Sequence, residues 1–136
     1  MLILNPREVR FGIQRWKDAR VITIDRLAVR EVVEWGDLGP HPTFADVPRS
    51  RLRVRVVIDA GPDMEDAPRP GETNTFAFTA SPSGAESGRR VVEMTCVVIS
   101  VAHEINAGKG ATRTIEFVAI STDGAADPVT ITEPGV

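Results

Sequence analysis

The residues that could perform acid–base or metal chemistry are few. The chain of 136 residues has two histidines, His41 in a proline-rich segment and His103 at the end of a valine-rich one. Histidine titrates near neutral pH and is the commonest metal ligand. Asp46 follows five residues after His41, and Glu104 directly follows His103, but neither pair has the further ligands or the helical spacing of a zinc site. We therefore expect no metal and no other cofactor.

Carboxylates gather in one segment, DAGPDMEDAPRPGE, which contains Asp63, Glu65 and Asp66. Oxygen ligands of this kind suit calcium, but the spacing does not follow the ligand ladder of an EF-hand loop. Arg69 and three prolines also interrupt the segment. We predict a solvated acidic loop.

Nucleophilic chemistry has no candidate either. AGKGAT, around Lys109, lacks the first glycine of a phosphate-binding loop, because His103 stands at that position. SPSGAESG lacks the Gly-x-Ser-x-Gly spacing of a nucleophile elbow. Cys96, the single cysteine, lies among apolar residues and is predicted to be a small buried side chain. We predict that the chain is not an enzyme.

Three arginines, Arg51, Arg53 and Arg55, alternate with aliphatic residues in RLRVRVVID, residues 51–59. In a strand, successive side chains point to opposite faces, so one face would be aliphatic and the other positively charged. An interface for nucleic acid would interleave aromatic side chains, and this segment has none. The net charge of −3 gives no electrostatic footprint for a polyanion. We expect the three arginines to face solvent or a partner subunit. Binding of nucleic-acid phosphates is the least favoured role.

Two aromatic residues, Trp35 and Phe44, flank a polar segment rich in glycine and proline. They could anchor the packing of that segment or contact a partner. Phe76, Phe78 and Phe117 lie instead in alternating segments, which predicts that they belong to the core.

The elements that would carry these residues are strands, because the dominant hydrophobic period is two. Residues 89–122 predict a long antiparallel hairpin, and DRLAVREVVEW and PDMEDAP leave room for at most one short helix. We predict a mainly β fold, an antiparallel sandwich or small barrel, with extended loops at about 35–50 and 60–73. With 42% hydrophobic and 26% charged residues, residues 1–136 suit one soluble domain, without a signal peptide or a membrane segment.

The segment VREVVEWGDLGPHPTFADVPRSRLRVRVVIDA and the later hairpin resemble the tail tube proteins of tailed phages and related injection machines. The resemblance spans about residues 20–122: an early strand, a long extended loop, a regular strand and a hairpin that closes a sandwich. It departs from the family in having no clear central helix. The resemblance implies a structural virion protein that forms stacked homo-oligomeric rings, usually hexamers, as a conduit for DNA.

The same resemblance implies roles for the residues named above. Trp35, His41 and Phe44 would lie in a loop that reaches a neighbouring subunit. Arg51, Arg53 and Arg55 would face a neighbour's carboxylates, such as those of Asp63, Glu65 and Asp66. The partners would be other copies and other tail or virion proteins, with no specific binding of nucleic acid and no membrane. The protein would be made in the host cytoplasm and reside in the virion tail.

Other functions fit the same sequence. A tail terminator, a distal-tail ring protein or a head decoration protein would also be rich in β-strands and non-catalytic. A monomeric β-sandwich that binds a glycan or peptide through Trp35 or Phe44 is a second class, and a small-barrel nucleic-acid binder is a third.

Overall fold

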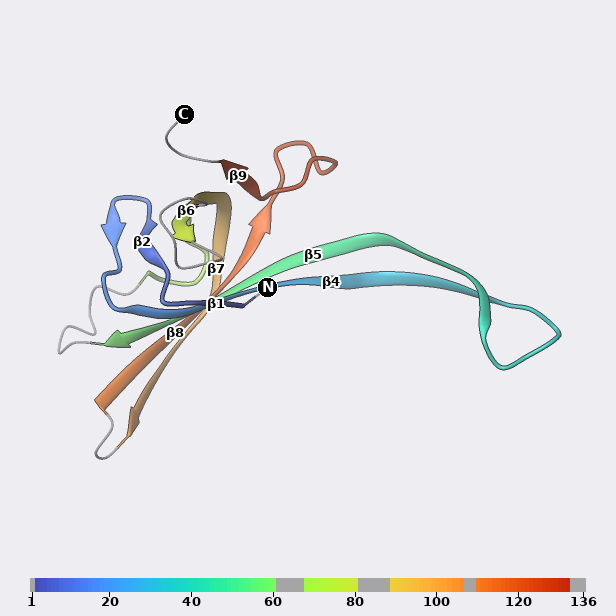
Figure 1. Ribbon diagram of the computed structural model, residues 1–136, viewed down its shortest axis with the longest axis horizontal. Helices are drawn as coiled ribbons and strands as arrows, with labels where there is room; N and C mark the ends of the chain where they lie inside the picture. Colours follow the sequence, from blue (N-terminus) through green and yellow to red (C-terminus); the bar gives the residue numbers. More distant parts are fainter. Residues whose placement is uncertain (1, 61–67, 81–88, 107–109, 133–136) are drawn as a thin grey trace.

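The chain folds into antiparallel strands, and its computed structural model describes residues 2–60, 68–80, 89–106 and 110–132 (Figure 1). Within these ranges there is no helix, so the predicted mainly β class is confirmed. The strands are β1 (Leu2–Leu4), β2 (Arg7–Phe11), β3 (Gln14–Arg15), β4 (Ala19–Trp35), β5 (Pro42–Ala60), β6 (Thr73–Ala80), β7 (Arg90–Asn106), β8 (Gly110–Ile120) and β9 (Thr130–Thr132).

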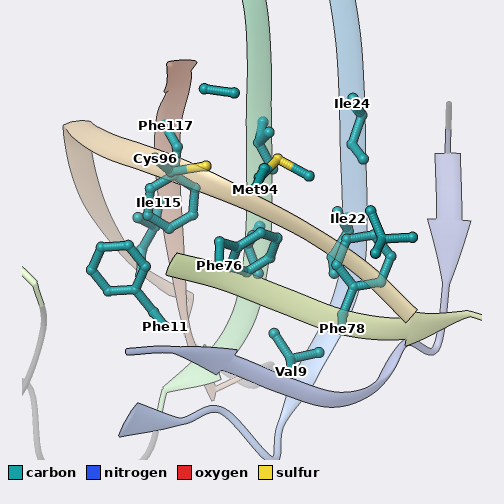
Figure 2. Close-up of a cluster of buried hydrophobic side chains, with 14 of the residues drawn as sticks. Val9, Phe11, Ile22, Ile24, Phe76, Phe78, Met94, Cys96, Ile115 and Phe117 are labelled. Atoms are coloured by element: carbon teal, nitrogen blue, oxygen red, sulfur yellow. The ribbon is translucent and has the colours of Figure 1, made fainter. Parts of the chain in front are cut away.

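All strands belong to one sheet, in the order β1-β4-β5-β8-β7-β6-β2-β3. β9 pairs with the first part of β7, beyond the point where β8 has ended. The ends of this order, β1 and β3, do not pair with each other in the described chain, so the sheet is open. Figure 2 shows β2, β6 and β7 crossing over β4 and β5, with the buried side chains between them. This arrangement agrees with the expected sandwich, and no closed barrel forms among the described strands.

The core forms where strand alternation points apolar side chains to the inside of this fold. In β5, Leu52, Val54, Val56 and Ile58 are all buried, as the period of two predicts. Phe76, Phe78 and Phe117 are fully buried, which confirms that they are core residues.

Aromatic rings fill the centre of the core. The ring of Phe117 lies 5.1 Å from that of Phe11 and 5.2 Å from that of Phe76, measured between centroids. Trp16 completes the group with its centroid 6.0 Å from Phe117. Rings at these separations attract one another beyond their hydrophobic burial, so this cluster ties β2, β6 and β8 together.

The longest hairpin, β4–β5, leaves the body of the molecule and continues as a two-stranded ribbon, which we call the arm, residues 26–51 (Figure 1). β1 pairs with β4 only at residues 21–23, and β8 pairs with β5 only from Arg53 onward. The strands of the arm therefore pair only with each other in the described structure.

The arm corrects the expectation of an extended loop over residues 35–50. Residues 42–50 belong to β5, and only residues 36–41 connect the two strands. Glycine and proline suggested a loop, but a proline is tolerated at a strand edge or a bulge, and Pro48 lies in an irregular stretch of the ladder between Asp46 and Arg49.

The other predicted local features have mixed outcomes. DRLAVREVVEW is β-strand and not the short helix that its propensity allowed, because pairing with β5 supersedes local preference. The hairpin over 89–122 is confirmed as β7 and β8. A loop was expected at residues 60–73, and PDMEDAP, a possible helical turn, lies within it. Residues 61–67 lie outside the described residues. Residues 68–72 form the turn that leads into β6.

Cys96 is fully buried in β7, and burial raises the pKa of its thiol to about 12. Since the thiolate is the reactive form, the thiol of the native protein should resist an aromatic disulfide reagent at pH 8. We expect labelling at least about 100-fold slower in buffer than in denaturant, where only rare opening of the sheet exposes the sulfur. Equal rates in the two conditions would contradict the burial of Cys96.

Candidate functional site

The described residues hold no group of three or more His, Cys, Asp or Glu side chains that could bind a metal. His41 and His103 are both exposed, on separate hairpins. His41 lies in the connection of the arm, and His103 is paired with Arg113 across β7 and β8. Asp63, Glu65 and Asp66 lie outside the described residues, so their expected contact with the arginine row is not placed.

Two surface hollows could bind a ligand: one lies at the root of the arm, beside Arg26, Arg51 and Asp127, and the other lies beside β2 and β6. Arg7, Arg15 and Lys17 contribute positive charge to the lining of the second hollow, next to Trp16. Glu8, also in the lining, accepts a hydrogen bond of 3.3 Å from the hydroxyl of Thr79. The lining residues of this second hollow include no serine, cysteine or histidine.

The arm is a long exposed element of the described structure. Every residue from 26 to 51 is exposed except Leu27 and Val32, which are partly buried. An isolated two-stranded hairpin is at best marginally stable in water. In the described structure no third strand pairs with the arm to stabilise it.

Large apolar side chains lie along this arm. Trp35 is 64% exposed and Phe44 is 50% exposed, and Val29, Leu38 and Val47 are exposed as well. Trp35, His41 and Phe44, which the sequence predicts as interface residues, all lie in this one exposed element.

Trp35 and Phe44 lie on the two strands of the arm at an irregular point of the ladder. Phe44 is the direct cross-strand partner of Glu34, and Trp35 is the partner of Pro42. The register shifts between Glu34 and Trp35, so the two aromatic residues do not follow a regular alternation of faces.

The arginines of the β5 row differ in their surroundings, and among them only Arg53 forms an ion pair within the described structure. Arg53 pairs with Asp25 of β4, with 3.7 Å between Nη2 and Oδ2. Arg55 lies opposite Glu116 in the β5–β8 ladder. Arg51 is exposed and lies opposite Leu27, and no ion pair of Arg51 occurs in the described structure.

Two further arginines of the arm belong with Arg51, and sequence reasoning missed them. Arg30 of β4 is the direct partner of Arg49 of β5, and both side chains are exposed. Like charges placed directly opposite each other destabilise a ladder. The ladder shifts register on both sides of this pair. A pattern of alternation alone could not bring the two residues together, because the pairing depends on those bulges.

The root of the arm is tied to the segment before β9. Arg26 Nη2 donates to Asp127 Oδ2 over 2.9 Å. The backbone N–H of Val129 and the guanidinium of Arg26 together hold the pKa of Asp127 below its ordinary value. Both side chains of this ion pair are more than half exposed, so it contributes at most about 1 kcal/mol and serves mainly to orient the root.

In comparisons with known proteins, no protein-family model matches the chain, and no curated protein matches it significantly. The described residues also contain no helix able to cross a membrane. The described residues form a mainly β chain with a protruding two-stranded arm, whose strands pair only with each other.

Proposed function

We propose that the chain is a structural protein that assembles with copies of itself through the arm. The observation that carries this proposal is that residues 26–51 are paired only with each other and expose both apolar and charged side chains. A second copy that contacts the arm would bury Trp35 and Phe44 and add partners to a ribbon that is marginal by itself.

Within this class, the arrangement favoured by the resemblance is a phage tail tube subunit that forms stacked rings around a channel for DNA. The order of an early strand, a long extended segment, a regular strand and a later hairpin supports it. The net charge of −3 also suits a conduit, since cations aligned on the phosphates would hold DNA in place. Another tail component or a head decoration protein would share the arm-mediated contact and differ in the assembly built from it.

A monomeric module that binds glycans or peptides is less well supported. Such a site needs aromatic side chains gathered on one surface. Neither Trp35 nor Phe44 lines the hollow beside β2 and β6 or the hollow at the root of the arm.

Negative-stain imaging of the purified chain tests the ring arrangement. At high protein concentration we expect closed rings of uniform diameter, or short stacks of them, because head-to-tail contacts close into rings when their rotation permits. Particles the size of one chain at every concentration would contradict self-assembly, and two-fold dimers alone would contradict the tail tube.

A further inference from the structure

The charges of the arm are separated along its length. Its outer part, residues 31–46, carries four carboxylates and no lysine or arginine, and we call it the acidic tip. The inner part, residues 26–30 and 47–51, carries four arginines and no carboxylate, and we call it the basic base. The acidic tip contains Glu31, Glu34, Asp37 and Asp46, and the basic base contains Arg26, Arg30, Arg49 and Arg51.

These charges are not neutralised within the described part of the molecule, with one exception. Arg26 is paired with Asp127 at the root of the arm. No ion pair is formed there by Arg30, Arg49 or Arg51, or by the four carboxylates of the tip. Three arginines and four carboxylates are thus left for partners that the described chain does not supply.

The register of the arm keeps the two signs apart. Arg30 lies opposite Arg49, whereas Asp46 lies opposite Val32 and Glu34 lies opposite Phe44. A ribbon stabilised by its own charges would place opposite signs across the ladder, as Asp25 and Arg53 are placed nearer the body. Folding the tip back onto the base would break the β4–β5 ladder, so the two parts cannot neutralise each other within one arm.

A second copy of the chain provides the complement to both parts. The acidic tip of the second copy is opposite in charge to the basic base of the first copy. The basic base of the second copy is likewise opposite in charge to the acidic tip of the first. A nucleic acid would match only the base and would be repelled by the tip. Resting on the self-assembly proposed above, we propose that the acidic tip of one arm docks on the basic base of a second copy's arm.

Charge reversal with mixing tests this contact. One chain carries Glu31→Lys, Glu34→Lys and Asp46→Lys, and the other carries Arg30→Glu, Arg49→Glu and Arg51→Glu. Each chain by itself then presents a tip and a base of the same sign, so we expect its self-association, followed by light scattering, to weaken at least about 10-fold. An equimolar mixture pairs opposite signs again, and we expect assemblies containing both chains in equal number.

A control chain keeps the arm intact and changes exposed residues of the body by the same amount of charge: Arg7→Glu, Arg15→Glu and Lys17→Glu. It should associate like the unmodified chain. If a triple variant does not fold, as judged by circular dichroism, Glu34→Lys and Arg51→Glu form the corresponding single-site pair.

Arg30→Glu alone separates docking from folding. It replaces a like-charge pair with an opposite-charge pair across the ladder, so the melting temperature of the monomer should not fall, while association should weaken. Unchanged association in this variant, or a mixture of the two reversed chains that stays apart, would overturn the docking. An unmodified chain that never associates would instead refute the proposed self-assembly on which the docking depends.

Discussion

Replacing Phe117 with Ala is expected to lower the free energy of unfolding by about 3–5 kcal/mol, the cost of emptying a buried aromatic site. Phe117 is fully buried, and its ring stacks against those of Phe11 and Trp16 and lies close to that of Phe76. These four rings come from β2, β6, β8 and the segment between β3 and β4, so their neighbours cannot close the cavity without moving whole strands. Urea denaturation followed by tryptophan fluorescence measures the loss, since Trp16 contacts the site directly.

Phe44→Ala is the matched control for this prediction. It removes the same atoms from an exposed position on the arm, so the monomer should lose at most about 0.5 kcal/mol. The comparison is made at a protein concentration low enough to keep the chain monomeric. A loss from Phe44→Ala as large as that from Phe117→Ala would mean that the arm packs against the body, contrary to the fold described.

The body of this fold could be predicted from the sequence because alternation is a local signal. In RLRVRVVID each aliphatic residue of even number is buried and each arginine is not, which follows from the period of a strand and needs no knowledge of neighbouring strands. The pairing of β7 with β8 was predictable for a similar reason, since two segments rich in valine, isoleucine and threonine stand on either side of a short sequence with asparagine and glycine.

The arm could not be predicted in the same way, because its strands are exposed on both faces and lack a buried row. When no row of side chains is buried, glycine and proline dominate the sequence pattern. That pattern predicts a loop at residues 42–50, which belong to β5 in the structure. The opposition of Arg30 and Arg49 depends on bulges, which set cross-strand register and leave little trace in the sequence. Asp25 and Glu116, which lie opposite Arg53 and Arg55 in the sheet, could not be assigned from the sequence, because both are distant from these arginines along the chain.

Shortening the arm is expected to abolish self-assembly and leave the monomer folded. The variant joins Ala28 to Ser50, which are direct partners in the ladder, through Asn-Gly, the dipeptide preferred in a two-residue hairpin turn. It deletes residues 29–49, of which only Val32 is even partly buried, so the core keeps all its members. Its thermal unfolding should match that of the unmodified monomer, because the deleted side chains do not contribute to the core.

The central claim is that the arm joins copies of the chain, and light scattering coupled to size exclusion tests it most directly. The intact chain and the shortened chain are compared over the same range of protein concentrations. We predict that the intact chain reaches masses that are multiples of 14.7 kDa, while the shortened chain stays monomeric. An intact chain that stays strictly monomeric at high concentration would contradict the account. So would a shortened chain that assembles into the same number of copies as the intact chain.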